Sequence, residues 1–210
     1  MKKILLYGDI DVNCYIIERN NKVYIIDPGY QPIRVRNYVK ENNLDVLGIL
    51  LTHGHINHIG AIDAFDVPVY LHKDEQVIIE DNYNNGFTYY GKEKPYDLES
   101  INLVYLEDKD ILKLDDKEIE VIHTPGHTPG CICFKIDNDL YTGDTLFKHT
   151  VGRWDFPLGN LSKLKKSVVN LIDSQEDNVM IHPAHGESST IGHEKNHNQF
   201  YKEWKKEISR

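Results

Sequence analysis

The chain has 210 residues, 40% of them hydrophobic, and a formal net charge of −9 at pH 7. Its length suits one domain with its own hydrophobic core, so we predict a single domain over residues 1–210. The acidic balance argues against a nucleic-acid partner, which would favour clustered Lys and Arg. No stretch approaches the roughly 20 apolar residues that span a bilayer, so we expect no membrane partner.

The N-terminus begins with Met1-Lys2-Lys3, and a short apolar run behind it stops at Tyr7. A secretory signal peptide needs a longer apolar region after its basic residues. We therefore predict that this segment is an edge strand and that the protein is cytoplasmic.

Short apolar runs rich in Val, Ile and Tyr alternate with helical patterns along the chain, which is typical of an α/β fold. Strands are predicted near residues 3–7, 13–19, 22–27, 46–51, 67–71, 102–105, 111–114, 118–123, 130–136, 138–143 and 178–181. Helices are predicted from Pro32 to about Asn43, behind the capping residue Asn160, and around Phe200, Trp204 and Ile208.

Two segments repeat one layout with the same Cys-to-Asp spacing, from Cys14 to Asp27 and from Cys131 to Asp144. Each reads as a hairpin that delivers an Asp at the end of its second strand. The repetition favours a sandwich of two similar halves, although two hairpins can also resemble each other by chance.

Two further features leave their function open. Cys131 and Cys133 share one face of a strand, and we expect them to be buried small residues rather than metal ligands. Residues 81–100 form a polar, aromatic segment. Such a segment either covers a binding site or is a plain surface loop.

The strongest chemical signal is Thr52-His53-Gly54-His55-Ile56-Asn57-His58, directly after the apolar run 46–51. Three imidazoles within six residues after a buried strand can wrap around a cation, because neutral imidazole is a good ligand for zinc or iron. A lone His is more often structural, but this spacing favours metal binding.

Three more candidate ligands follow predicted strands further along the chain. His127 lies in the Pro- and Gly-rich turn 124–130, and Asp144 comes where the strand 138–143 ends. His185 follows the apolar run near 178–181 and precedes Gly186.

Together these motifs resemble the metallo-β-lactamase superfamily, and within it the glyoxalase II-like hydrolases. The matching residues are His53, His55, Asn57, His58, His127, Asp144 and His185, with Asn13-Cys14-Tyr15, Asp27-Pro28-Gly29 and Gly152-Arg153. The resemblance covers nearly the whole chain, in order. It implies a four-layer αββα sandwich with the metals at one edge of the two sheets.

The resemblance also implies a site for two divalent metal ions, with zinc favoured over iron or manganese. His53, His55 and His127 would hold the first ion. His58, His185 and the residue at position 57 would hold the second, and Asp144 would bridge the two. A hydroxide forms near neutral pH between two such ions, because cations lower the pKa of water.

Position 57 departs from the family pattern, because Asn57 stands where the family has Asp. An amide oxygen can ligate a metal but brings no negative charge, so we expect a weakened second site. The amide also offers an N–H donor that could orient the attacking hydroxide differently. We expect hydrolysis to be reduced by about 10²–10⁴, the range of a positioned acid–base group.

Other residues near the motifs have two interpretations. Arg153 either contacts an anionic substrate, as the resemblance implies, or pairs with Asp155 to hold its loop. His149 is a candidate substrate contact, and Asp27 either supports the metal loop or is a turn residue. The remaining histidines are expected to be structural or solvated: His72, His123, His182, His193 and His197.

The resemblance implies metal-dependent hydrolysis of a thioester or related acyl compound, with a small acyl- or thiol-containing molecule as partner. Full glyoxalase II proteins carry a C-terminal helical extension for glutathione, and only 25 residues follow His185 here, so we expect a short thioesterase.

A mononuclear-iron persulfide dioxygenase using His53, His127 and Asp144 is one alternative. A degenerate, non-catalytic metal-binding domain is another. The β-lactamases proper are disfavoured, because a Cys ligand for the second metal is missing. The sequence does not indicate an oligomeric state.

Overall fold

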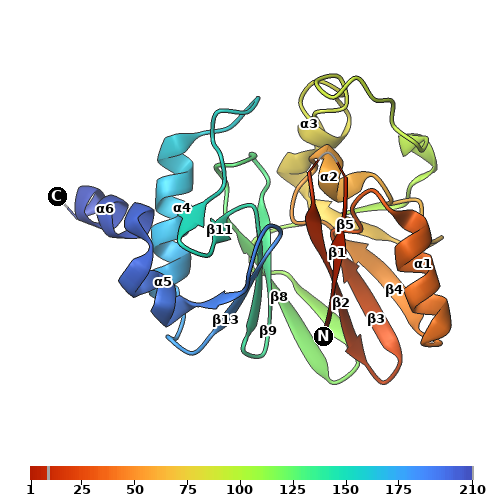
Figure 1. Ribbon diagram of the computed structural model, residues 1–210, viewed down its shortest axis with the longest axis horizontal. Coiled ribbons are helices and arrows are strands. Elements are labelled where there is room, and N and C mark those ends of the chain that lie inside the picture. The colour runs from red at the N-terminus through yellow and green to blue at the C-terminus, as the bar shows by residue number, and fades with distance from the viewer. Residues whose placement is uncertain (9, 210) are drawn as a thin grey trace.

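Two six-stranded β-sheets face each other at the centre of the molecule, as the computed structural model shows for residues 1–8 and 10–209 (Figure 1). The first sheet has the order β1 (Lys2–Leu6), β2 (Val12–Arg19), β3 (Lys22–Ile26), β4 (Asp45–Leu50), β5 (Val69–His72) and β6 (Leu103–Leu106). The second has the order β14 (Ser189–Thr190), β13 (Met180–Pro183), β10 (Asp139–Gly143), β9 (Ile132–Ile136), β8 (Lys117–His123) and β7 (Ile111–Leu114). A small hairpin joins β11 (Leu146–Phe147) to β12 (Thr150–Val151).

Helices cover the outer faces of both sheets, which gives the four-layer αββα architecture of the metallo-β-lactamase fold. The helix α1 (Pro32–Glu41) lies outside the first sheet, and α4 (Leu161–Ser174), α5 (Ile191–His197) and α6 (Gln199–Ile208) lie outside the second (Figure 1). The shorter helical segments are α2 (Ile56–Ile59), α3 (Gln76–Ile79) and the 3₁₀ turns Lys73–Glu75 and Leu98–Ser100.

Three apolar clusters hold these layers together. Tyr15, Leu50 and Phe134 belong to the cluster between the two sheets. Val35 of α1 packs against the outer side of the first sheet. Leu164 of α4 does the same on the second sheet. The central strands of each sheet are thus buried on both faces, which explains why β2, β3 and β9 are apolar over most of their length.

The two halves of the molecule have matching topology. The strand β2 pairs antiparallel with β3, which runs parallel to β4. In the second sheet β9 pairs antiparallel with β10, which runs parallel to β13. The hairpins that begin at Cys14 and Cys131 therefore occupy equivalent places, and each presents its Asp at the end of the inner strand.

The predicted elements are confirmed, and several short elements went unpredicted. All eleven predicted strands form within a few residues of their expected bounds, and β1 lies at the edge of its sheet. Pro32 begins α1, and the Asn160 side chain accepts from Lys163 N to cap α4. The elements that went unpredicted are β11, β12, β14, α2, α3, α5 and the two 3₁₀ turns, which have two to seven residues each and show no clear apolar period in the sequence.

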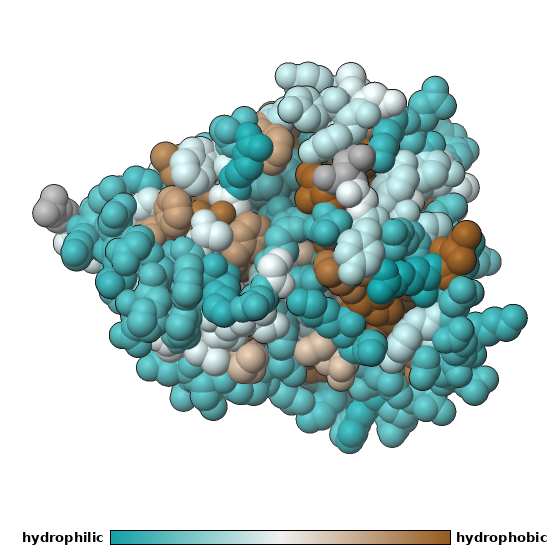
Figure 2. Space-filling view, in the orientation of Figure 1, coloured by the Kyte–Doolittle hydropathy of each residue, from teal (hydrophilic) through white to brown (hydrophobic). Residues whose placement is uncertain are grey.

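The cysteines bear out one further expectation. Cys131 and Cys133 are buried and unpaired, as expected of small core residues. The surface in view is mostly hydrophilic, with smaller apolar areas (Figure 2). None of the helices in the described part of the chain has the length and hydrophobicity to cross a bilayer.

Gly126 is required by a close packing contact, which predicts a large effect of Gly126→Ala. Its φ is +147°, and a Cβ there would lie 2.4 Å from Cα and N of Leu164 in α4. We expect the variant to lose about 3 kcal/mol of unfolding free energy, because the backbone of α4 must shift. Gly91→Ala is the matched control: its φ is +61° with nothing within 4 Å, so strain alone applies and the loss is about 1 kcal/mol. Equal losses in urea unfolding would contradict this account.

Candidate metal centre

Every predicted ligand lies at one edge of the sandwich, because the strands that carry them point the same way. The strands β8, β10 and β13 of the second sheet are mutually parallel through their pairings. Their carboxyl ends deliver His127, Asp144 and His185. In the first sheet, β3 and β4 are also parallel. They end next to Asp27 and the loop 52–58 respectively.

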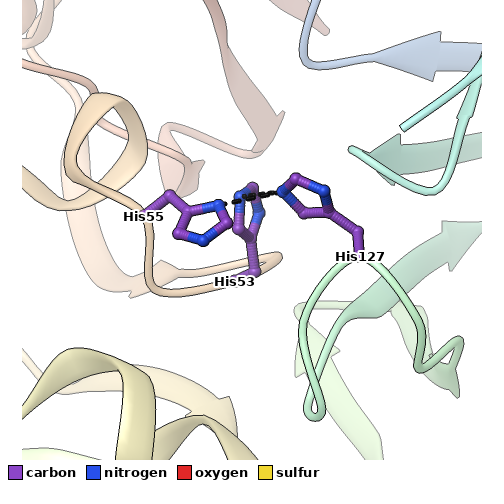
Figure 3. A group of neighbouring side chains, drawn as sticks. All are labelled: His53, His55 and His127. Atoms are coloured by element: carbon purple, nitrogen blue, oxygen red, sulfur yellow. Dashed lines mark hydrogen bonds between the residues drawn. The ribbon is translucent and has the colours of Figure 1, made fainter. Parts of the chain in front are cut away.

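Three imidazoles form the first donor group. Nε2 of His127 lies 2.9 Å from Nδ1 of His55 and 3.2 Å from Nε2 of His53 (Figure 3). Donor atoms bound at about 2.1 Å to one tetrahedral ion lie roughly 3.4 Å apart. The spacing in the structure is close to that value, so this group fits a single transition-metal ion.

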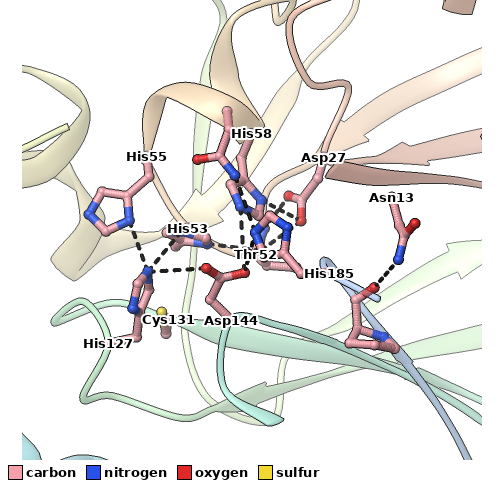
Figure 4. A network of polar contacts seen from close by, with 12 residues as sticks. Asn13, Asp27, Thr52, His53, His55, His58, His127, Cys131, Asp144 and His185 are labelled. Carbon is pink, nitrogen blue, oxygen red and sulfur yellow. Dashed lines mark hydrogen bonds and ion pairs between the residues drawn. The ribbon is translucent and has the colours of Figure 1, made fainter. Parts of the chain in front are cut away.

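The second donor group gathers around the carboxylate of Asp144 (Figure 4). Its Oδ1 lies 3.3 Å from Nε2 of His185 and 3.6 Å from Nε2 of His58. Its Oδ2 lies 3.5 Å from Nε2 of His127, which belongs to the first group. One carboxylate oxygen thus faces each group, which is the geometry of a bridging ligand.

Hydrogen bonds on the outer ring nitrogens fix which nitrogen faces the centre. Nδ1 of His127 donates to the carbonyl of Arg153 at 2.6 Å, and Nδ1 of His185 donates to the carbonyl of Asp11 at 2.6 Å. Nε2 of His127, whose pKa burial lowers, is left with its lone pair directed inward. Burial also lowers the pKa of His185, but the Asp144 carboxylate and the Asp11 carbonyl outweigh it and raise that pKa to about 9, so a metal ion would displace the Nε2 proton of His185. Imidazole ligands of metals are commonly held in this way.

Two buried polar atoms at the centre fit a cation. Within the described residues, Nε2 of His58 and Oδ1 of Asp144 are buried and have no hydrogen-bond partner. A buried polar atom without a partner costs free energy, and several inward lone pairs repel one another. A divalent ion would satisfy these donors together, so the residues present fit the metals that the fold implies.

Electrostatics keep the imidazoles of the first group in the form that binds metal. Burial, followed by the neighbouring His58, holds the pKa of His53 well below its usual range. Burial and His127 do the same for the pKa of His55. Burial alone would raise the pKa of Asp144, but His185, His127 and His58 together lower it well below the ordinary value. The bridging group is therefore anionic at neutral pH.

Asp27 and Thr52 fix the start of the histidine loop. The carboxylate of Asp27 accepts from Thr52 N at 2.9 Å and from Thr52 Oγ1 at 2.7 Å. Its Oδ2 also lies 2.9 Å from Nδ1 of His58. The structure thus places this strand-end Asp against the metal loop. Its φ of +51° shows a backbone conformation that these contacts maintain.

Glu75 is a supporting residue that sequence reasoning missed. It is fully buried, and its carboxylate accepts from Gly54 N at 2.8 Å, Gly130 N at 2.8 Å and Thr128 Oγ1. Gly54 separates His53 from His55, while Gly130 and Thr128 belong to the His127 turn. One carboxylate therefore joins the two loops of the first donor group. Nothing in its local sequence distinguishes it from a surface acid.

The remaining predicted site residues take different positions. The amide Nδ2 of Asn57 lies 3.3 Å from Nε2 of His185, beside the second donor group. Arg153 forms a two-point ion pair with Asp155, at 2.9 Å for each contact, so the loop-holding interpretation describes its side chain. His149 packs against His193 of α5, its ring centroid 4.8 Å away. A role of either residue in substrate binding stays a prediction.

Phe156 is a second residue that the motifs did not indicate. Its ring centroid lies 5.4 Å from that of His55 and 6.0 Å from that of His127. The guanidinium of Arg153 lies 4.3 Å above the same ring. The loop after Asp144 thus supplies an aromatic wall to the first donor group.

Comparison with known proteins shows that the chain belongs to the metallo-β-lactamase superfamily, whose family model matches residues 7–185. The hydroxyacylglutathione hydrolase GloC of Haemophilus influenzae is 34% identical over 202 residues, covering 90% of this chain and 92% of that protein. The superfamily assignment identifies the protein as a metallo-hydrolase, and its fold as one that binds divalent metals.

Two solved structures resemble it over nearly its whole length. The BLEG-1 B3 metallo-β-lactamase has a TM-score of 0.83 and 32% identity, covering 95% of this chain and 98% of that one. TTHA1623, crystallised in a di-iron-bound form, has a TM-score of 0.81 and 30% identity, covering 95% of this chain and 100% of that one.

The burial of Glu75 predicts a pH-dependent effect of Glu75→Gln. Burial outweighs the three hydrogen bonds and raises the pKa of Glu75 to about 7, from an ordinary value of 4.5. Between these values the folded protein binds more protons than the unfolded chain, so this group's contribution to stability falls as pH rises. Glutamine does not titrate. The stability advantage of the native protein over Glu75→Gln should therefore shrink by about 3 kcal/mol from pH 4.5 to 7.

The measurement is urea unfolding of metal-free protein across this pH range. Glu99→Gln, at an exposed position, controls for the loss of a surface charge. A stability difference that stays constant with pH would show that Glu75 remains charged throughout.

Proposed function

We propose that the protein is a two-metal hydrolase of thioesters or related acyl compounds, with a weakened second site. The observation that carries the proposal is the sharing of the Asp144 carboxylate, which lies 3.5 Å from Nε2 of His127 and 3.3 Å from Nε2 of His185. A bridging carboxylate between two imidazole groups is a ligand set for two neighbouring ions. Its negative charge offsets their mutual repulsion.

The first ion would be held by His53, His55 and His127, and the second by His58, His185 and Asn57. Zinc is the ion that we favour, with iron as the alternative that the di-iron form of TTHA1623 supports. Manganese is a third possibility. When bound, such ions lower the pKa of water and polarise a carbonyl oxygen, which suits acyl hydrolysis at neutral pH.

The chain's own residues orient the reaction. Hydrogen bonds to the carbonyls of Arg153 and Asp11 hold His127 and His185 in the required tautomer. The amide of Asn57 offers either Nδ2 or Oδ1 to the second group, depending on its orientation about χ2. As a donor it would position an oxygen nucleophile or substrate oxygen, and as an acceptor it would be a neutral ligand.

A pocket beside the second donor group supports a small acyl substrate. It is lined by Tyr7, Gly8, Ile10, Tyr30, Ile56, Asn57, Tyr90 and Lys92. Tyr90 and Lys92 come from the segment 81–100, which supports the covering role among its two interpretations. The aromatic walls suit an apolar acyl or thiol group. A thiolate is a good leaving group, so a thioester needs no strong general acid.

Asn57→Asp should strengthen the second site and raise turnover. A carboxylate adds negative charge among neutral donors, so we expect a second metal equivalent and a gain in kcat of about 10²–10⁴. The measurements are elemental analysis of zinc-loaded protein and hydrolysis of an acyl-thioester. Asn57→Ala is the matched control, which removes the amide without adding charge and should gain neither. Two tightly held ions and unchanged turnover in the native protein would contradict a weakened site.

The reaction class is tested by a substrate panel on metal-loaded protein. Thioester hydrolysis by the native protein or by Asn57→Asp supports the proposal. Oxygen consumption with a persulfide and one iron per chain would favour the dioxygenase alternative, and nitrocefin hydrolysis alone would favour a β-lactamase, as BLEG-1 is described. Tight metal binding with no turnover in either variant would favour a degenerate domain.

A further inference from the structure

Three histidines outside the two-metal centre meet on the surface. His149 lies in the turn of the β11–β12 hairpin, and His193 and His197 lie on α5. Residues four apart on a helix share one face, so the helix presents two imidazoles toward the hairpin. His149 and His197 are exposed, and His193 is partly buried. None of the three belongs to the donor groups around Asp144.

The rings lie close enough to share a ligand after a small adjustment. Nε2 of His149 is 2.5 Å from Nε2 of His193, and the two donors would move apart to the roughly 3.4 Å that separates ligands on one tetrahedral ion. The ring centroid of His197 lies 4.4 Å from that of His193 and 6.2 Å from that of His149. The side chain of His197 is exposed, and a change of its rotamer would be needed to bring a ring nitrogen to the same ion.

Buried hydrogen bonds build this arrangement. His149 has a φ of +66°, in the left-handed region that non-glycine residues rarely adopt. Its backbone N–H donates to Oε2 of Glu194 at 2.8 Å, and that carboxylate is fully buried. Glu194 also accepts from Ser189 Oγ at 2.6 Å and from Asn198 Nδ2 at 3.0 Å. The hairpin turn is thus fixed to α5 in the conformation that aims His149 at His193.

Charges near the cluster do not oppose a cation. Lys148, next to His149, pairs with Glu187, and Lys195, on α5, pairs with Asp177. A carboxylate oxygen of Glu194 lies within 4.8 Å of the ligand nitrogens of His149 and His193. Its negative charge favours a cation there, while its hydrogen bonds keep it in the supporting role.

We propose that His149, His193 and His197 form a surface site for one divalent transition-metal ion, separate from the two-metal centre. Imidazole donors select zinc, nickel or copper over magnesium or calcium, and water would complete the coordination of an exposed ion. The bound ion ties the β11–β12 hairpin to α5. That hairpin also carries Phe147, whose ring centroid lies 5.7 Å from that of His185. Occupancy of the surface site therefore stiffens a wall of the second donor group.

The experiment uses native protein, its two histidine variants and a control variant, each loaded with zinc and freed of excess ion by gel filtration. Zinc is then titrated in by isothermal calorimetry, with metal per chain measured by elemental analysis. We expect the native protein to bind one equivalent in the micromolar range beyond those that its two-metal centre takes up, and a further rise in Tm with it. Both should be lost in His149→Gly and in His193→Gln.

His149→Gly is the most informative variant, because it removes the imidazole and should leave the turn folded. A φ of +66° suits glycine. Its Tm without added zinc should equal or exceed that of the native protein. Asn196→Ala, an exposed change on the same helix, is the matched control and should keep the extra equivalent. Absence of a further equivalent in the native protein would overturn the proposal. So would an equivalent that survives both histidine variants.

Discussion

The carboxylate of Asp144 is the interaction on which the site depends. It is an anion at 9% exposure, and the imidazoles of His58, His127 and His185 face its oxygens at 3.3–3.6 Å. A buried charge without compensation is expensive, so the three histidines and the ions they would hold make its burial possible. Their loops come from both sheets. The site therefore also joins the two halves of the sandwich at one edge.

Two other buried carboxylates maintain the loops around Asp144. Asp27 fixes the start of the histidine loop through Thr52, and Glu75 joins that loop to the His127 turn. Both accept backbone N–H groups that a loop would otherwise leave unpaired. A third buried carboxylate, Glu194, performs the same task for His149 at the surface. In each case a buried carboxylate accepts hydrogen bonds from the backbone of a loop, and these bonds fix the conformation in which the loop presents its imidazoles.

Much of the fold could be predicted from the sequence, because long buried strands appear in it as runs of apolar residues. The run before Thr52 and the hairpins ending in Asp27 and Asp144 are examples, and their bounds agree within a few residues. The hairpin β11–β12 and the helix α5 gave no such pattern, since they are short and held by tertiary hydrogen bonds. Glu75 was missed for the same reason: its partners Gly54 and Gly130 lie 21 and 55 residues away.

By itself the sequence determined the chemistry: which side chains carry imidazole or carboxylate, that they follow strands, and that position 57 holds an amide. Local pattern encodes these facts, because strand periodicity and turn residues act over a few positions. Only the tertiary structure decided which atoms face one another. In the folded chain Arg153 forms an ion pair with Asp155, and the ring of His149 packs against His193 of α5. Glu75 accepts hydrogen bonds from two loops. Such pairings depend on how distant segments pack, and packing brings together residues that no local pattern connects.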